Sequence, residues 1–93
     1  MLVIKTYACR ETAALAARSR SKRLPSTIAA VALRKLRMLD AATCLEDLRV
    51  PPANRLEALA KDRAGQHSIR INDQWRLCFV WKDGHAYGVE IVD

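Results

Sequence analysis

The chain has 93 residues, enough for one small domain with a modest core, so any chemistry must take place on its surface. Lys and Arg number 16 against 10 Asp and Glu, which gives a net charge of +6, and the excess lies in residues 1–50. Such a charge attracts polyanions, although many inert domains are also basic. The apolar runs are too short for a bilayer and the start is unlike a secretory signal, so we expect a cytoplasmic protein without a membrane partner.

The N-terminal part of the chain indicates a strand, a helix and a basic loop. Residues 2–7 are apolar and β-branched, which is typical of a strand. Residues 10–17 are rich in alanine and favour a helix. Residues 18–23 combine Arg, Lys and Ser and end before Pro25, so we expect a positively charged loop there.

A second helix is predicted from Ser26, where apolar residues begin to recur at helical spacing. It should end between residues 40 and 43, and residues 43–48 could add one further turn. Two consecutive prolines exclude regular helix in the next segment, so residues 49–54 should form an extended connection.

The second half of the chain is predicted to be an antiparallel sheet. Asp83-Gly84 is a strong signal for a tight hairpin, and Asn72-Asp73 indicates an earlier turn. The sequence therefore predicts one domain, residues 1–93, of the α+β class, with two N-terminal helices packed on a small twisted antiparallel sheet. The expected strands are residues 55–59, 67–71, 74–81 and 86–92.

Arginine is the residue type with the clearest potential for chemistry. Cleavage of RNA without a metal needs a group that takes the proton of a ribose 2′-hydroxyl, a proton donor for the leaving oxygen, and cations that stabilise the phosphorane. Arg63, Arg70 and Arg76 come from neighbouring segments of the predicted sheet, so they could face one concave surface. Alternatively, each is an exposed arginine balanced by a nearby carboxylate.

Histidines, aromatic residues and cysteines give weaker signals. Neither His67 nor His85 has an obvious partner, although His67 begins a strand beside the turn that contains Arg63. Two histidines and scattered carboxylates form no ligand cluster, so no metal or other cofactor is expected. Trp75 and Tyr87 could stack on RNA bases, but aromatic side chains in strands are more often part of the core. The cysteines are interpreted as small core residues: Cys9, Cys44 and Cys78.

Several segments carry a resemblance to a known family, in register over about two-thirds of the chain. They are residues 32–43, Leu48-Arg-Val-Pro-Pro52, Asn54-Arg-Leu-Glu-Ala-Leu59, the run from Asp62 to Arg76, and Val89-Glu-Ile-Val-Asp93. These segments resemble the HigB branch of the RelE/ParE superfamily of bacterial toxins. Residues 1–25 fit that family only in their pattern of a strand followed by a helix.

The resemblance implies a RelE-like fold of two helices against an antiparallel sheet, in agreement with the elements predicted above. It also implies a type II toxin that acts as an mRNA interferase, a ribosome-dependent endoribonuclease that cuts messenger RNA during translation. The family's antitoxin, HigA, is a helix-turn-helix protein, and the complex of the two represses its own operator. Basic residues would then contact RNA and the ribosome, and we assign this role to Arg18, Arg20, Lys22, Arg23, Arg34, Arg37 and Arg70.

Site residues can be transferred from the family position by position. Arg63 and Arg76 match arginines suited to holding the scissile phosphate and the nearby backbone. Asp93 matches the aspartate of a family ending Asp-Tyr-His, but no Tyr-His follows here, and Glu57 stands where some members have a catalytic histidine. Either these groups are missing and the toxin is weakened or inactive, which we favour, or Glu57, His67 or Asp93 replaces them.

Three hypotheses follow. The first is the endoribonuclease, with Arg63 and Arg76 stabilising the anion and Asp93, helped by Glu57 or His67, near the 2′-hydroxyl. The second is a catalytically silent module of the same fold that serves as antitoxin partner and co-repressor. The third is a gyrase inhibitor of the ParE type, which shares the fold.

Overall fold

The structure is a computed structural model, and it describes residues 3–17 and 24–93. None of the helices in this part of the chain has the length and apolar character that a membrane-crossing helix requires. The elements are helices α1 (Arg10–Ala16) and α2 (Ser26–Ala41), short 3-10 turns η1 (Leu45–Arg49), η2 (Pro52–Asn54) and η3 (Lys61–Arg63), and strands β1 (Glu57–Ala58), β2 (His67–Arg70), β3 (Arg76–Lys82) and β4 (His85–Val92).

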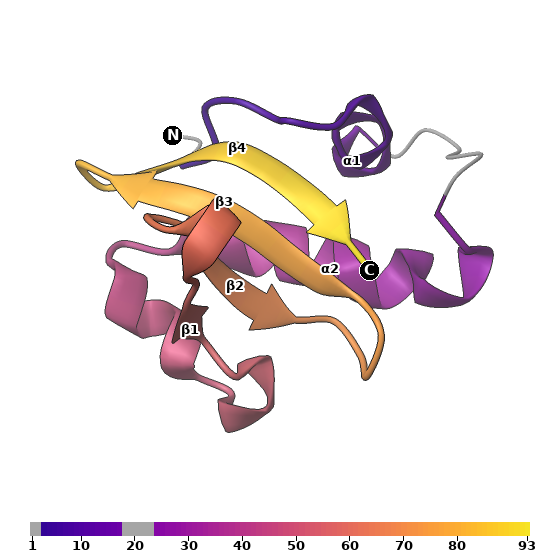
Figure 1. The fold of residues 1–93 in the computed structure, drawn as a ribbon. Coiled ribbons are helices and arrows are strands. Elements are labelled where there is room, and N and C mark those ends of the chain that lie inside the picture. The colour runs from indigo at the N-terminus through magenta and orange to yellow at the C-terminus, as the bar shows by residue number, and fades with distance from the viewer. Residues whose placement is uncertain (1–2, 18–23) are drawn as a thin grey trace.

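The four strands form an antiparallel meander in the order β1-β2-β3-β4. Helix α2 packs across one face of the sheet, behind β3 and β4 in Figure 1, and α1 lies beside β4. The expected α+β architecture, two helices on a small antiparallel sheet, is confirmed. The opposite face of the sheet is not covered by either helix, and we call it the open face.

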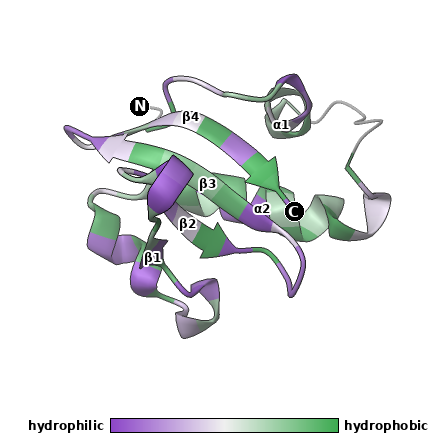
Figure 2. Ribbon diagram, viewed as in Figure 1, coloured by the Kyte–Doolittle hydropathy of each residue, from purple (hydrophilic) through white to green (hydrophobic). Residues whose placement is uncertain are grey.

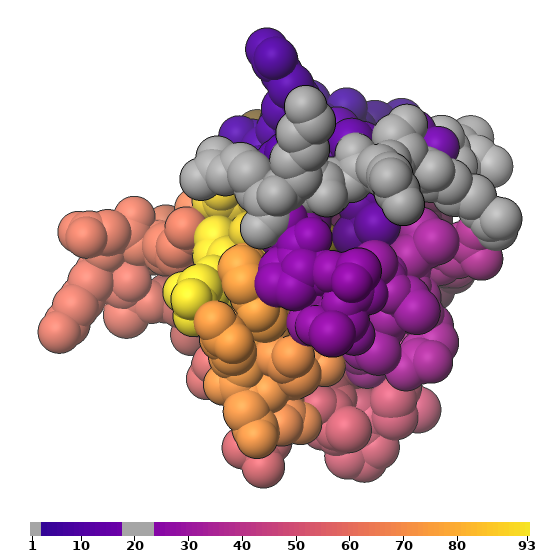
Figure 3. Space-filling view, turned by 90° about the vertical axis from the view of Figure 1, so that its right-hand side faces the viewer, coloured from indigo at the N-terminus to yellow at the C-terminus, as the bar shows by residue number. Residues whose placement is uncertain are grey.

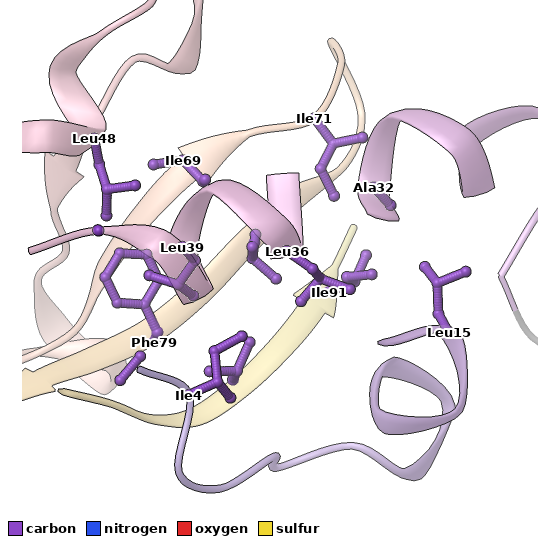
Figure 4. Close-up of a cluster of buried hydrophobic side chains, with 14 of the residues drawn as sticks. Ile4, Leu15, Ala32, Leu36, Leu39, Leu48, Ile69, Ile71, Phe79 and Ile91 are labelled. Carbon is purple, nitrogen blue, oxygen red and sulfur yellow. The ribbon is translucent and has the colours of Figure 1, made fainter. Parts of the chain in front are cut away.

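The core lies between α2 and the sheet. In the second half of β4, a hydrophilic residue lies between hydrophobic ones in Figure 2, because successive side chains of a strand point to opposite faces. Burying each large apolar side chain contributes about 1.5–3 kcal/mol, so this layer supplies much of the stability. The buried cluster (Figure 4) joins Ile28, Ala32, Leu36 and Leu39 of α2 to the strand residues Ile69, Leu77, Phe79, Val89 and Ile91.

In its described part, the segment before α1 does not form the regular strand expected there. It makes two isolated parallel bridges to β4, Ile4 with Ala86 and Tyr7 with Val89. The segment also contacts α2, where Asp40 Oδ1 accepts hydrogen bonds from the backbone N–H of Ile4 and of the preceding residue, both at 2.9 Å. Backbone hydrogen bonds from Lys5 N to the carbonyl of Ala86, 2.8 Å, and from Ala8 N to the carbonyl of Val89, 3.0 Å, hold the segment to β4 as well.

The connection after α2 is more helical than expected. Residues 49–54 were predicted to be extended, but Pro52–Asn54 form η2, which is possible because proline suits the first position of a helical turn. Asn54 is fully buried and donates a 3.1 Å hydrogen bond to the carbonyl of Leu48. Its Oδ1 accepts a hydrogen bond from Lys35 Nζ, which ties this connection to α2.

Strand β1 is also shorter than the expected 55–59, because Arg55 has a left-handed φ of 47° that excludes it from a strand. The Asp83-Gly84 hairpin is confirmed. Both residues have positive φ, 51° and 79°, as a type I′ turn requires.

One irregularity interrupts the β3–β4 ladder. Cys78 pairs with Glu90, but Val80 pairs with Tyr87, so β4 contains one more residue than β3 between these pairs. Gly88 lies in this stretch with φ of 59°, the left-handed conformation that glycine adopts in a β-bulge. The bulge changes which β4 side chains reach the open face.

Candidate functional site

A row of four residues crosses the centre of the open face, one from each strand. Directly paired residues in antiparallel strands point to the same side of the sheet. The pairs are Glu57 with Ser68, Ser68 with Cys78, and Cys78 with Glu90. The row therefore places two carboxylates at its ends and a hydroxyl and a thiol between them.

Arg76 reaches this row from the start of β3. Its Nη2 lies 2.7 Å from Glu57 Oε1, and its Nε donates a 2.9 Å hydrogen bond to Ser68 Oγ. The side chain is 31% exposed. A guanidinium fixed at two points in this way is preorganised, yet still accessible to a ligand from the open face.

Arg63 reaches the other end of the row from η3. Its Nη1 lies 2.9 Å from Glu90 Oε1 and 3.0 Å from Gln66 Oε1, and the side chain is 36% exposed. Turn η3 stands on the side of the sheet away from α2 in Figure 1, and the salmon segment that contains it projects from the molecule in Figure 3. Arg63 thus approaches the open face from a projecting turn instead of from the sheet itself.

Both guanidinium groups act on the same buried thiol, that of Cys78. Burial raises the pKa of Cys78 above its ordinary value, and the positive charge of Arg63 and, more weakly, of Arg76 opposes that rise. With Cys78 only 2% exposed, the thiol is a packed side chain and not a nucleophile. Cys78 thus lies between the two arginines, which are held at opposite ends of the row, Arg76 by Glu57 and Arg63 by Glu90.

This arrangement can bind an oxyanion. Each guanidinium has five N–H donors, and the contacts described above use at most three of them, so donors remain for a phosphate. In the free protein each cation is paired with one carboxylate, Arg63 with Glu90 and Arg76 with Glu57. A phosphate must therefore compete with these carboxylates, and a displaced carboxylate is a ready proton acceptor.

His67 is not brought together with the two arginines. It pairs with Phe79, whose side chain is in the core, and the two rings stack with centroids 6.4 Å apart. Among the residues that the structure describes, its buried Nδ1 has no hydrogen-bond partner. The sequence contained the signal: His67 has the same parity as Ile69 and Ile71, so strand alternation places it on the side of α2.

Asp93 lies just beyond β4 and makes no ion pair with Arg63 or Arg76 in the described part of the chain. Its Oδ2 accepts a 3.0 Å hydrogen bond from Gln74 Nε2. Asp93 also lines a cavity of about 350 Å³ beside β4, together with Glu90 and six further described residues, among them Trp75. Asp93 is therefore close to one end of the row without contacting its cations.

The proposed RNA-contacting residues are dispersed. Arg34 and Arg37 are exposed on α2, on the side of the molecule away from the open face. Arg70 pairs with Arg76 in the β2–β3 register, so it shares the open face, where it forms an ion pair with Asp73. Four further residues of this group lie outside the described residues: Arg18, Arg20, Lys22 and Arg23.

The interpretation of all three cysteines as core residues was wrong for Cys44, which is exposed, while Cys9 is half-buried and Cys78 is buried. Cys44 precedes η1, where its Sγ lies 3.5 Å from Asp47 Oδ1. Within residues 3–17 and 24–93, no group of three or more His, Cys, Asp or Glu side chains could hold a metal ion.

The sequence suggested Asp62, Asp73 and Glu90 as carboxylates near the three arginines without assigning Glu90 to Arg63, and it missed Ser68 as a partner of Arg76. The signal was again strand alternation, because Ser68 precedes buried Ile69 and Glu90 lies between buried Val89 and Ile91. Which residues meet across strands additionally requires the register, which the sequence alone does not provide.

Comparison with known proteins assigns the chain to a family. Residues 16–92 match the family model described as the RelE-like toxin of the type II toxin-antitoxin system HigB. The chain belongs to this HigB toxin family. The RelE-like fold of the family agrees with the two helices and the antiparallel sheet, and membership of a type II system implies an antitoxin partner.

Two relatives of this HigB-family protein have similar sequences. Toxin HigB-1 of Vibrio cholerae is 49% identical over 67 residues, which cover 72% of this chain and 70% of the Vibrio protein. An uncharacterized protein of Haemophilus influenzae is 41% identical over 64 residues, 69% of this chain and 63% of that protein. The matched part of the chain thus spans somewhat less than two-thirds of the Haemophilus protein.

Proposed function

We propose that this HigB-family protein is a metal-independent endoribonuclease that cuts messenger RNA on the ribosome, and that a HigA-like helix-turn-helix antitoxin neutralises it. The observation that supports the proposal most is that Arg63 and Arg76 both reach the open face, each held by a carboxylate of the row, and that the charge of both acts on Cys78 between them. Two guanidinium groups that contact one phosphate can stabilise the extra negative charge of a phosphorane. The net charge of +6 supports attraction to RNA.

In the proposed reaction the phosphate binds between the two arginines and takes over donors that Glu57 and Glu90 occupy in the free protein. Glu57, freed from Arg76, accepts the proton of the ribose 2′-hydroxyl. The 2′-oxygen then attacks phosphorus, the bond to the 5′-oxygen breaks, and a 2′,3′-cyclic phosphate and a 5′-hydroxyl result. Water protonates the leaving oxygen, and we assign Asp93 a supporting role at the end of β4. His67 is left out of this scheme because it lies on the other face.

The proposal is tested in a bacterial cell-free translation reaction in which cleavage of the translated messenger RNA is mapped by primer extension. Arg63→Ala and Arg76→Ala should each lower the cleavage rate by about 100-fold or more, because each removes a donor to the transition state. Arg49→Ala is the matched control. Arg49 also forms an ion pair, with Glu46, but on exposed η1, so its loss should leave the rate unchanged.

The same assay compares this chain with a version extended by the Tyr-His of the family ending. We expect faster cleavage by the extended chain, since the added side chains supply proton transfer that contributes about 10²- to 10⁴-fold in such reactions. Absence of cleavage by both chains would remove the enzymatic proposal.

A second function, the silent antitoxin partner and co-repressor, is favoured by one observation. Both arginines already have a carboxylate partner, so Arg63–Glu90 and Arg76–Glu57 could serve only as structural ion pairs. This function predicts a tight complex with the antitoxin and binding to operator DNA without damage to RNA. Copurification, an operator mobility shift and the cleavage assay above separate the two functions.

A further inference from the structure

A second concave region lies on the open face, next to the β3–β4 hairpin. It is a cavity of about 460 Å³. Its walls are apolar and aromatic toward the sheet and charged toward the turn. The residues that line it are Val80, Lys82, Asp83, Tyr87 and Gly88.

The β-bulge places Tyr87 in this cavity. Counting back from Glu90 on the open face, strict alternation would direct Gly88 to that face and Tyr87 to the core. The extra residue in β4 instead pairs Tyr87 with Val80, which shares the parity of Cys78. The bulge is fixed from outside the hairpin, since Gly88 N donates a 2.7 Å hydrogen bond to Thr6 Oγ1. Bulges of this kind re-aim side chains beside functional sites.

Tyr87 is also unlike the other large aromatic residues of the sheet. Trp75 and Trp81 pack against the buried hydrophobic cluster, whereas Tyr87 and Val80 are not part of it. The Tyr87 hydroxyl makes no hydrogen bond within the described residues. Tyr87 is thus a half-buried side chain that lines the cavity and has no structural partner for its polar end.

The cavity lies farther along β3 than the row that the two arginines contact. Val80 follows Cys78 by two residues, about 7 Å along a strand, and Cys78 belongs to the row whose carboxylates hold Arg63 and Arg76. Lys82, at the far side of the cavity, is exposed and takes part in no ion pair within residues 3–17 and 24–93. The open face thus carries Lys82 on one side of the Tyr87 ring and the row with its two arginines on the other, and basic and aromatic side chains in one groove are common in proteins that bind single-stranded nucleic acids.

We propose that this cavity binds a base of single-stranded RNA next to the phosphate held by Arg63 and Arg76. The base stacks on Tyr87 and packs against Val80, and Lys82 contacts the following phosphate. The inference rests on the proposed function, because the neighbouring phosphate fixes where the base must lie. The cavity is then a nucleotide subsite that positions the RNA and influences where it is cut.

The test compares Tyr87→Ala, Tyr87→Leu and Tyr87→Phe with the wild type. Binding of a fluorescently labelled single-stranded oligoribonucleotide is measured by anisotropy, and cut sites are mapped in the translation reaction. Tyr87→Ala and Tyr87→Leu should weaken binding at least about 5-fold, the lower limit for a base stacked on an aromatic ring, and redistribute the cut sites. Tyr87→Phe keeps the ring and should retain both properties.

Two controls separate stacking from loss of structure. The melting temperature of each variant is measured, and Tyr87→Leu, which keeps apolar bulk, should remain folded even if Tyr87→Ala does not. An oligoribonucleotide that carries 4-thiouridine is irradiated with each protein, and the crosslinked peptide identified by mass spectrometry should contain Tyr87.

Lys82→Gln should weaken binding at low salt, whereas Arg49→Gln should not.

The outcomes distinguish this inference from the proposed function. If the wild type cuts RNA and the Leu and Ala variants keep its affinity and cut sites, the subsite is overturned and the endoribonuclease stands. If the wild type binds RNA through Tyr87 but cuts none, the subsite stands and the enzymatic proposal fails. If the variants lose only affinity for the antitoxin, the cavity is a protein-binding site and the inference is overturned.

Discussion

Cys78 shows how a residue can lie at the centre of a site without taking part in its chemistry. Its register partners are Ser68 and Glu90, and both Arg63 and Arg76 influence its thiol. Charged and polar groups around a cysteine usually indicate reactivity, but here burial outweighs the cations and raises the pKa of the thiol. We interpret Cys78 as a small spacer that lets the row pack closely.

Native protein treated with iodoacetamide should therefore be modified at exposed Cys44 first, and at Cys78 only after unfolding. Peptide mass spectrometry over time, with and without denaturant, measures both rates. Equal rates for Cys44 and Cys78 in the native protein would contradict the interpretation of Cys78 as a packed, unreactive thiol.

Lys35 is a second residue whose role depends on its surroundings. It is 7% exposed, and burial, followed by repulsion from Arg34 and Arg70, lowers its pKa below the ordinary value of 10.5. The unfolded chain therefore binds this proton more tightly than the folded chain does. The free energy of unfolding should rise as the pH increases from the lowered pKa toward 10.5.

Lys35→Met lacks the titrating group and should lack this rise. Urea unfolding at about pH 7 and about pH 10 gives the free energy of unfolding of the wild type and of the variant. From the lower to the higher pH, this free energy should increase for the wild type relative to Lys35→Met. Lys5→Met, at an exposed position, is the control and should follow the wild type. If the free energies of unfolding of wild type and Lys35→Met differ by the same amount at both pH values, the burial of a charged amine at Lys35 is contradicted.

At the residue scale, much of the site was accessible from the sequence. The buried partners Ile69, Leu77 and Ile91 define the parity that puts Arg76 on the open face and His67 on the other. The carboxylate partners of Arg63 and Arg76 could not be predicted from the sequence. Nothing near either arginine in the chain indicates which strand or turn supplies its carboxylate.

Among the elements, β4 contains the β-bulge at Gly88, on which the proposed subsite depends. Gly84 and Gly88 both have positive φ, and neither would meet another atom with an added Cβ, so substitution acts through the backbone. Gly84→Ala and Gly88→Ala should each lower the free energy of unfolding by about 1–2 kcal/mol. Urea unfolding measures both.

The two variants should differ in RNA binding. Gly88→Ala strains the bulge that directs Tyr87 to the open face, so it should weaken binding of the oligoribonucleotide beyond its effect on stability. Gly84→Ala alters only the hairpin turn and is the matched control. Equal affinities for the two variants, measured at a temperature where both are folded, would argue against a functional role for the bulge.

Elements with local signals were predicted well. The amphipathic helix from Ser26 and the Asp83-Gly84 hairpin are determined by spacing and by turn chemistry within a few residues. The segment before α1 depends instead on Asp40, more than 30 residues away, which takes two of its backbone donors. Long-range partners of this kind, like the bulge at Gly88, leave no pattern in a single sequence.

For the whole molecule, charge should govern the strength of RNA binding. The net charge is +6, and single-stranded nucleic acid releases counterions when Lys or Arg contacts its phosphates. A plot of log affinity against log salt concentration should lose about 0.7 of slope for each phosphate contact removed. Arg63→Ala and Lys82→Gln should show this change in fluorescence anisotropy titrations. Arg49→Gln should keep the wild-type slope, and a loss of slope there would mean that charge acts without a defined site.

The sheet has two edges, and each limits the ways in which copies of this protein could join. Strand β4 is eight residues long, and its outer backbone would offer a template for growth into fibres, but Ile4 and Tyr7 bridge to it and Asp40 fixes Ile4 in place. The other edge, β1, is two residues long and too short to template another chain. The molecule can therefore expose a whole face of its sheet to a ligand, while neither edge of the sheet offers a free strand long enough to pair with another copy and polymerise.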